Sequence, residues 1–379
     1  MKKKITMILT CVGGRLIFDI IKAFRDADDY NLNIVGVDLN KDAHGRLLCD
    51  NFYLVPPAEK EPKKWISEIL KIADKENVDL IIPLSDGESI QISENLKLFD
   101  NKKIKTSANN LNFIKLISDK YLMMSFLKKN KVNSGTFSKV DDISDVRTLL
   151  EEYNYPEKKF VLKPRYGRGS RGVLICDNGK LSFDTLLEDR FCGSGSFEQI
   201  DKKLTRLNYR LDNYLMMPFY ENIICDVDCL SKNGKQVDIA IRERQLKNPL
   251  MPTSTGHKIR MDNDIKDYVR SLCKIFKING PSDFDIVKDD NGNPILLDAG
   301  SRFSGSVGGS FTAGKNMLSQ LIRVLFDLPL KTTEIRDGCV LRPYITMAEI
   351  PKKNEKDFLW SSLQLFRHAW IHLGFQERF

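Results

Sequence analysis

The sequence lacks any apolar run that approaches the about 18 residues of a membrane-spanning helix, so a membrane protein is not expected. Three lysines followed by the apolar stretch 5–12 resemble a signal peptide only faintly, because the stretch is short and no small-residue cleavage site follows. A long Lys/Arg run and a basic stripe interleaved with aromatics are also missing. The 59 basic and 51 acidic residues leave a net charge of +8 spread along the chain, which gives no support to nucleic-acid binding.

The eight cysteines form no C-x-x-C pair, which favours reduced thiols in the cytoplasm over a disulfide framework. His368 and His372 have the spacing of a shared helix face that could bind a metal. No third ligand is near them in the sequence, and a surface helix is the preferred interpretation. There is no internal repeat and no low-complexity segment. The 379 residues are enough for two or three domains of about 150 residues each.

What the first hundred residues do contain is an alternation of buried strands and amphipathic helices, which indicates a parallel, doubly wound sheet. The expected elements are, in chain order, 5–10, 16–24, 33–38, 65–73 and 78–83. Gly13 and Gly14 follow the first strand and Asp38 ends the second, as in a dinucleotide-binding fold. The third glycine of G-x-G-x-x-G is missing and Arg15 follows directly, so a tight turn is preferred over a dehydrogenase site.

After residue 117 the pattern changes. Residues 118–120, Ser-Asp-Lys, cap an expected helix at 121–129, and a small α+β unit follows with strands and a helix at 136–140, 146–152, 160–163 and 173–176. Asn-Gly pairs at 233–234 and 291–292 lie between alternating apolar runs and predict two hairpins. Residues 211–300 are therefore expected to form a largely antiparallel sheet. A helix, a strand and an amphipathic tail are expected at 316–326, 340–345 and from 358 onward.

The first segment that suggests chemistry is a glycine-rich basic loop after the strand that ends at Lys163. The loop combines three glycines with three arginines: Gly167, Gly169, Gly172, Arg165, Arg168 and Arg171. Glycines let backbone N–H groups approach phosphate oxygens, and the cations neutralise the phosphate charge. A mobile basic hairpin on the surface is the alternative. The density of cations directly after a buried strand favours phosphate binding.

The second segment places a carboxylate on each strand of the second hairpin. Asp285 and Asp298 on adjacent antiparallel strands can present two acids to one point, which suits Mg²⁺. Arg302, four residues later, could hold a phosphoryl group or a carboxylate. The alternative is that both acids face water at strand ends, but Asp298 follows a buried apolar run. Residues 309–316 nearly spell a P-loop, yet end in Asn and are better interpreted as the start of the following helix.

In this order the motifs resemble those of the ATP-grasp superfamily, in the branch similar to the carbamoyl-phosphate synthase large subunit and related carboxylate–amine ligases. The resemblance runs from residue 5 to about 350 and includes a hinge-like strand at 214–219. It implies an α/β (α+β) fold with a Rossmann-like pre-ATP-grasp domain at 1–112. A two-lobed ATP-grasp fold follows. Its lid subdomain with the Gly-rich loop spans 113–213, and its C-terminal subdomain with the metal site and tail helix spans 214–379.

The resemblance implies ATP and Mg²⁺ as cofactors and assigns roles to individual residues. The nucleotide contacts are Lys120, Lys163, Gly167, Arg168, Gly169, Ser170 and Gly172 for phosphates, Met217, Pro218 and Phe219 for adenine, and Glu221 for ribose. The metal ligands are Asp285 and Asp298, and the catalytic cations are Arg302 and Lys163. The substrate-facing residues are Arg242, Arg244, Thr255, Gly256 and Ser304. The sequence departs from the family pattern at Gly300, where Asn is usual, and at Asp298, where Glu is common.

The implied function is an ATP-dependent ligase that activates a carboxylate as an acyl phosphate, which an amine then attacks with release of ADP and phosphate. The alternatives are carbamoyl-phosphate synthase-type chemistry on bicarbonate and a nucleotide-binding protein with weak or lost turnover. Small-molecule carboxylate and amine substrates are the expected partners, with no nucleic acid and no membrane. A cytoplasmic homodimer is the expected assembly, and the loop 167–172 is expected to close as a lid over bound nucleotide.

Overall fold

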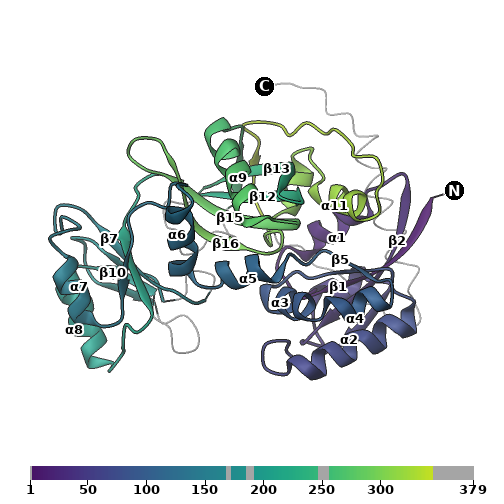
Figure 1. Cartoon of the computed structure of the whole chain (residues 1–379), viewed down its shortest axis with the longest axis horizontal. Helices are drawn as coiled ribbons and strands as arrows, with labels where there is room; N and C mark the ends of the chain where they lie inside the picture. Colours follow the sequence, from purple (N-terminus) through teal and green to yellow (C-terminus); the bar gives the residue numbers. More distant parts are fainter. Residues whose placement is uncertain (1, 168–171, 185–191, 246–255, 345–379) are drawn as a thin grey trace. The chain divides into compact units, whose positions relative to one another are not determined.

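The computed structural model describes residues 2–167, 172–184, 192–245 and 256–344, and within these ranges the strands form three sheets (Figure 1). The mixed α/β class expected from the sequence is confirmed. The expected tail helix from residue 358, with His368 and His372, lies outside the described residues. None of the helices in the described ranges has the length and apolar content needed to cross a lipid bilayer.

The first sheet is parallel, with the strand order β3-β2-β1-β4-β5. Its strands are β1 (Lys3–Thr10), β2 (Tyr30–Asp38), β3 (Asn51–Leu54), β4 (Leu80–Ile82) and β5 (Lys105–Thr106). The connecting helices are α1 (Ile17–Arg25), η1 (His44–Leu48), α2 (Pro62–Glu76), α3 (Asp86–Glu94), α4 (Leu96–Asn101) and α5 (Leu111–Ile117). The doubly wound arrangement predicted from the alternating pattern is therefore confirmed.

The apolar run of β1 is continuous because both faces of this sheet are covered. Met7 and Leu9 pack into a core that includes α1, whereas Ile8 packs into a second core that includes α2. Trp65 of α2 is fully buried in that second core. The first core also contains side chains of helix α11 (Met317–Leu325), so a helix from the far end of the described chain packs beside α1 (Figure 1).

The second sheet has the order β6-β11-β7-β8-β10-β9. Its strands are β6 (Ser138–Val140), β7 (Phe160–Pro164), β8 (Leu174–Cys176), β9 (Ser182–Asp184), β10 (Cys192–Gly195) and β11 (Tyr214–Pro218). Helices α7 (Ile143–Leu149) and α8 (Phe197–Arg206) contribute Val146, Phe197 and Ile200 to its core. The sequence analysis grouped 214–218 with the later antiparallel sheet, but β11 pairs with β6 and β7. We therefore propose that the boundary between the two later parts follows β11.

The third sheet is antiparallel, with the order β16-β15-β12-β13-β14-β17. Its strands are β12 (Cys225–Lys232), β13 (Lys235–Arg244), β14 (His257–Arg260), β15 (Gly280–Lys288), β16 (Pro294–Gly300) and β17 (Val340–Leu341). Both Asn-Gly hairpins are confirmed, β12–β13 and β15–β16. Asn233 and Gly234 have φ values of 52° and 75°, the left-handed pair that a tight two-residue hairpin turn requires.

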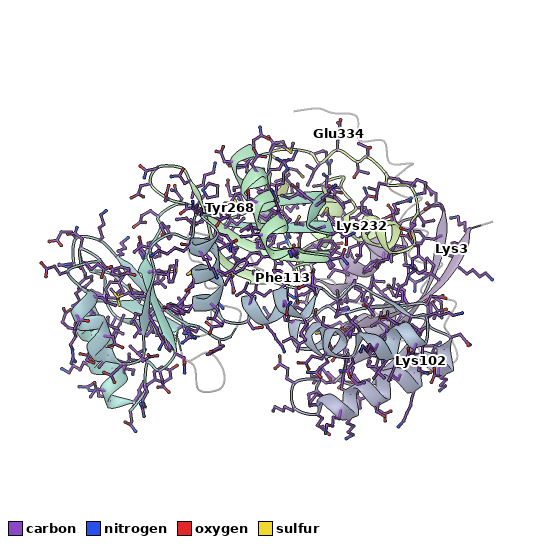
Figure 2. All side chains as sticks on the ribbon, viewed as in Figure 1. Lys3, Lys102, Phe113, Lys232, Tyr268 and Glu334 are labelled. Carbon is purple, nitrogen blue, oxygen red and sulfur yellow. The ribbon has the colours of Figure 1, made fainter. Side chains whose placement is uncertain are left out.

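Helices from two regions of the sequence cover the third sheet. They are α5, α6 (Lys120–Lys129) and α9 (Asn263–Phe276), whose apolar side chains share one core with β12 and β15. Phe113 on α5 and Tyr268 on α9 are both labelled in Figure 2. Phe113 packs on Phe276 of α9 with ring centroids 5.4 Å apart. The hydroxyl of Tyr268 accepts the backbone N–H of Leu296 at 3.1 Å. The short helix α10 (Gly308–Thr312) and then α11 follow. Residues 309–312 of the P-loop-like segment lie in α10, and Asn316 at its end caps α11, the helix expected there.

Candidate functional site

Two lysines predicted from separate motifs meet beside a predicted metal carboxylate. Lys163 lies near the end of β7, and its Nζ donates to the carbonyl of Leu297 on β16 at 2.9 Å. Lys120 is the first residue of α6, and its Nζ donates to the carbonyl of Gly167 at 2.9 Å. The same Nζ lies 3.2 Å from Oδ1 of Asp298. Side chains of α6, β7 and β16 therefore lie together between the second and third sheets, and two of them are lysines.

The N-terminus of α6 is fixed by the residue that precedes Lys120. Asp119 accepts the backbone N–H groups of Tyr121 and Leu122 at 2.9 and 3.3 Å, which makes it the helix cap. It also forms a two-point ion pair with Arg165, at 3.1 and 2.5 Å. Burial alone would raise the pKa of Asp119, but this arginine holds it below its ordinary value. Arg165, which the sequence placed in the phosphate loop, thus orients the start of α6.

Lys163 is buried, and nearby carboxylates offset only part of the cost of burying its positive charge. Only 7% of the residue is exposed. Burial, followed by repulsion from Lys120, lowers its pKa to about 7, although Asp298 and Asp285 partly oppose the shift. A strongly shifted lysine between two sheets is typical of a functional site, because a purely structural position would be more stable with an apolar residue.

Asp285 and Asp298 face each other as cross-strand partners on β15 and β16, next to a register shift in the ladder. Each side chain is about one third exposed, at 30% and 32%. Burial, with repulsion from Asp226 and Asp298, raises the pKa of Asp285 to about 6 against the opposing effect of Arg244. Within the described ranges no cluster of three or more His, Cys, Asp or Glu side chains has metal-site geometry. A cation here would thus take the remaining ligands from phosphate and water oxygens, as Mg²⁺ commonly does.

One face of the third sheet carries five carboxylates and three guanidinium groups. Cross-strand register and ion pairs place on it Asp226, Asp228, Asp283, Asp285 and Asp298 with Arg242, Arg244 and Arg302. Burial raises the pKa of Asp283 well above its ordinary value despite the nearby Arg302. Lys120 and Lys163 lie at the edge of this face, so its cations and carboxylates are matched in number.

Arg244 is tied into this acidic face. Its guanidinium lies 2.7 Å from Oδ1 of Asp285 and 2.5 Å from Oδ1 of Asp226. His257 of β14 contacts the other oxygen of Asp226 at 2.6 Å. Burial would raise the pKa of Asp226, but Arg244 and His257 hold it well below its usual range. The expected substrate residue Arg244 is thus a partner of the candidate metal carboxylate.

Arg242 is a buried arginine that contacts a neighbouring segment of the chain. Its side chain is fully buried and donates to the carbonyl and hydroxyl oxygens of Ser306 at 2.6 and 2.7 Å. It also pairs with Asp228 and donates to the hydroxyl of Ser304 at 2.7 Å. These contacts hold the chain at 304–306, and a substrate role for Arg242 stays a prediction. Ser304 is held in the same network and is 7% exposed.

Replacing Arg242 by Met is expected to destabilise the fold by about 3–5 kcal/mol, because the carboxylate of Asp228 would remain buried without its partner. Chemical denaturation measures this change. Arg260→Ala is the matched control, since Arg260 is 42% exposed and its pair with Glu243 should contribute less than about 1 kcal/mol. Equal, small losses in both variants would contradict the structural role of Arg242.

The residues expected to contact adenine and ribose lie on the connection between the second and third sheets. Met217 is 2% exposed and packs into the core of the third sheet, although β11 belongs to the second. The backbone N–H of Phe219 donates to the carbonyl of Lys159 at 3.0 Å. Glu221 is exposed and pairs with Lys159 at 2.7 Å. Pro218 ends β11, and residues 219–224 connect it to β12 of the third sheet, so the hinge role of 214–219 stays a prediction.

Several expected site residues lie outside the described ranges, namely Arg168, Gly169, Ser170 and Thr255. Gly167 and Gly172 flank the undescribed part of the loop with φ values of 117° and 82°. A Cβ on Gly172 would come within 2.7 Å of Cγ of Pro164. Gly256, with φ of 82°, would place a Cβ 2.0 Å from the carbonyl oxygen of Leu341. Backbone geometry therefore accounts for both Gly172 and Gly256.

Arg302 lies between a carboxylate of the third sheet and a carboxylate of helix α3. It donates to Asp283 of β15 at 3.1 Å and to Asp86, the first residue of α3, at 3.3 Å. Burial would lower its pKa, but Asp86 and Asp283 raise it. Asp86 was not among the site residues expected from the sequence. The signal was its position just after the third predicted strand, at the carboxyl edge of a parallel sheet where functional side chains collect.

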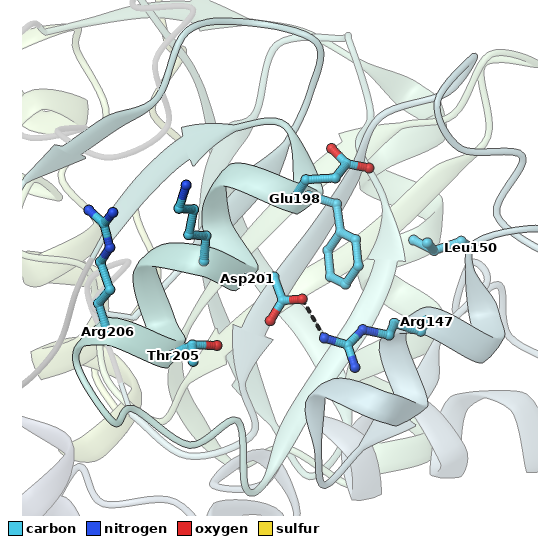
Figure 3. A pocket seen from close by; sticks show the side chains of 8 residues that line it. Arg147, Leu150, Glu198, Asp201, Thr205 and Arg206 are labelled. Atoms are coloured by element: carbon cyan, nitrogen blue, oxygen red, sulfur yellow. Dashed lines mark hydrogen bonds and ion pairs between the residues drawn. The ribbon is translucent and has the colours of Figure 1, made fainter.

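A cavity of about 520 Å³ lies away from this site, on the outer side of α7 and α8 (Figure 3). Arg147 and Asp201 form an ion pair across it at 2.5 Å, and Arg206 lies at its edge (Figure 3). The cavity is open to solvent and its lining includes none of the residues that the sequence motifs singled out. The converging lysines and acids, and not this cavity, form the candidate site.

Family models match two parts of the chain. Residues 210–345 match the model described as ATP-grasp in the biosynthetic pathway with Ter operon, and residues 7–112 match the PylC-like N-terminal domain. No curated protein sequence matches the chain significantly. The ATP-grasp match at 210–345 covers all described strands of the third sheet together with Asp285, Asp298 and Arg302.

Solved structures are similar over most of the chain. L-amino acid ligase from Bacillus licheniformis is 13% identical, with a TM-score of 0.59 over 86% of this chain and 75% of that one. N5-Carboxyaminoimidazole synthetase from Staphylococcus aureus, complexed with ADP, is 15% identical, with a TM-score of 0.63 over 88% and 81%. The biotin carboxylase domain dimer of 2-oxoglutarate carboxylase from Hydrogenobacter thermophilus, with MgADP, ADP and bicarbonate, is 15% identical, with a TM-score of 0.60 over 87% and 72%.

At these identities the structural matches establish the fold, and the two family models name its parts. The chain therefore joins a PylC-like N-terminal domain to an ATP-grasp domain.

Proposed function

We propose that the protein is an ATP-dependent carboxylate–amine ligase. The γ-phosphoryl group of ATP is transferred to a carboxylate oxygen, giving an acyl phosphate and ADP. An amine nitrogen then attacks the acyl carbon, forms the C–N bond and displaces phosphate. The observation that carries the proposal is the convergence of Lys120, Lys163 and Asp298 between the second and third sheets. Solved neighbours include an L-amino acid ligase and proteins with bound ADP, which supports it further.

The protein's own contribution to this reaction is positioning and charge. Lys120 and Lys163 would bind phosphate oxygens, exchanging their present carbonyl and carboxylate contacts for the nucleotide. Arg302, held at a fixed position, would stabilise negative charge on the transferring phosphoryl group. Asp285 and Asp298 would hold Mg²⁺, which when bound neutralises phosphate charge. The likeness to a MgADP complex supports this choice of metal.

Amino acids are the substrate class we propose for the carboxylate and amine, by analogy with the L-amino acid ligase. A homodimer is proposed as the assembly, since one similar structure is a domain dimer. The second candidate function is activation of bicarbonate. It is favoured by one observation, the bicarbonate anion reported with the 2-oxoglutarate carboxylase domain, and uses the same lysines and acids.

The test is phosphate release from ATP and Mg²⁺ across pairs of amino acids, with bicarbonate as a separate arm. We expect release that requires one or two amino acids and yields ADP with a product one water lighter than the sum of its substrates. Release that depends on bicarbonate alone would favour the second candidate. Nucleotide binding without release under any condition would contradict both and leave a nucleotide-binding protein.

A further inference from the structure

The helix that follows strand β4 of the first sheet contributes a side chain to the surroundings of Arg302. Asp86 is the first residue of α3, which follows the carboxyl end of β4. Its Oδ2 accepts from Nη2 of Arg302 at 3.3 Å, and its Oδ1 accepts the backbone N–H of Ser301 at 3.2 Å. One carboxylate therefore contacts both the arginine and the backbone just before it. The two contacts together define where the guanidinium lies relative to its own chain.

The opposite side of the same guanidinium is held by the third sheet. Nη1 of Arg302 donates to Oδ2 of Asp283 at 3.1 Å and to the carbonyl of Phe303 at 3.0 Å. Arg302 thus spans a gap between a carboxylate of the N-terminal domain and one of the ATP-grasp domain. An unrestrained arginine samples many rotamers, and the entropy cost of fixing its side chain is offset by these contacts before substrate binds.

Gly300 lies next to this arrangement. A Cβ at that position would lie 3.4 Å from Oδ1 of Asp86 and 3.6 Å from Cζ of Arg302, which are ordinary van der Waals separations. The backbone that leads into Arg302 therefore packs closely beside both side chains.

We propose that Asp86 is a positioning residue for phosphoryl transfer: it fixes the guanidinium of Arg302, so that the N-terminal domain takes part in the chemistry of the ATP-grasp site. This inference rests on the proposed function. The competing explanation is that the Asp86–Arg302 pair only joins the two domains. A second ion pair between the same two domains serves as the control that separates these explanations. In it, both carboxylate oxygens of Asp29 accept from the buried Arg323 of α11 at 2.7 Å.

The experiment compares Asp86→Asn with Asp29→Asn in the full-length protein. Both substitutions remove one carboxylate charge from an ion pair between the same two domains, but only Asp86 contacts Arg302. We expect Asp86→Asn to lower kcat by about 10- to 100-fold, the size expected when a catalytic group is slightly misplaced. The KM for ATP and the ADP dissociation constant should stay within about twofold, and Asp29→Asn should leave kcat unchanged.

A double variant gives the second readout. Arg302→Lys should itself lower kcat, and adding Asp86→Asn to it should produce little further loss if Asp86 acts through Arg302. Normal kcat in Asp86→Asn, or losses in the double variant that multiply fully, would overturn the positioning role while leaving the proposed function intact. Absence of phosphate release by the wild-type protein would overturn both.

Discussion

Replacing Asp298 by Asn is expected to lower Mg²⁺-dependent turnover by about 10²–10³-fold, the effect of losing one preorganised electrostatic contact to the transition state. The amide keeps the shape of the side chain but loses the charge that a metal ligand supplies. Metal-free ADP binding should change far less, because the carboxylate acts on the nucleotide only through the metal. Steady-state phosphate release at limiting and saturating Mg²⁺ measures the first effect, and calorimetry with ADP measures the second.

Asp285→Asn should behave in the same way, since Asp285 is the cross-strand partner of Asp298. Its turnover should need more Mg²⁺ to reach half of its maximum. Asp264→Asn is the matched control, because that side chain on α9 is 70% exposed and pairs with Lys288 away from the site. Normal turnover of Asp285→Asn and of Asp298→Asn at limiting Mg²⁺ would show that the two carboxylates are structural.

Lys163→Met is expected to weaken nucleotide binding by about 1.5–3 kcal/mol, the range for losing a charge-assisted hydrogen bond. The same substitution should stabilise the ligand-free fold near pH 7, because a methionine has no charge to bury. The wild-type protein has a Lys163 pKa lowered to about 7, whereas the unfolded chain has the ordinary value of 10.5. The unfolded state thus binds more protons between these values, and wild-type stability should rise with pH across that window.

Nucleotide binding should also protonate this lysine. Phosphate oxygens beside Lys163 favour its charged form, so at pH 8 ADP binding should take up protons from the buffer. Calorimetry in two buffers with different ionisation enthalpies measures the uptake. The wild-type protein should show it and Lys163→Met should show less. Equal uptake in both proteins would place the proton on another group.

Local sequence patterns predicted the elements that carry the candidate site. The strand ending at Lys163 and the two hairpins are where the pattern placed them, because a buried strand and an Asn-Gly turn are specified by neighbouring residues. The pairing of Asp285 with Asp298 followed from one hairpin. These features depend on contacts between residues close in sequence, and a single amino-acid sequence is enough to predict such contacts.

Features set by distant contacts were not predictable in this way. The burial of Arg242 on β13 depends on its contacts with Asp228 and with the segment at 304–306, which lies 62 to 64 residues further along the chain. The pairing of β11 with β6 and β7 depends on residues far back in the chain. Asp86 and Arg302 are 216 positions apart, so no local pattern connects them.

The central claim, that nucleotide binds between the second and third sheets, is tested most directly by hydrogen exchange with and without MgADP. The site contacts β7 on one side and β16 on the other, through Lys163 and the backbone of Leu297. The account predicts increased protection of residues 160–164 and 294–300 together, and unchanged exchange at α7 and α8, which line the separate cavity. Protection of α7 and α8 with no change in β7 and β16 would contradict it.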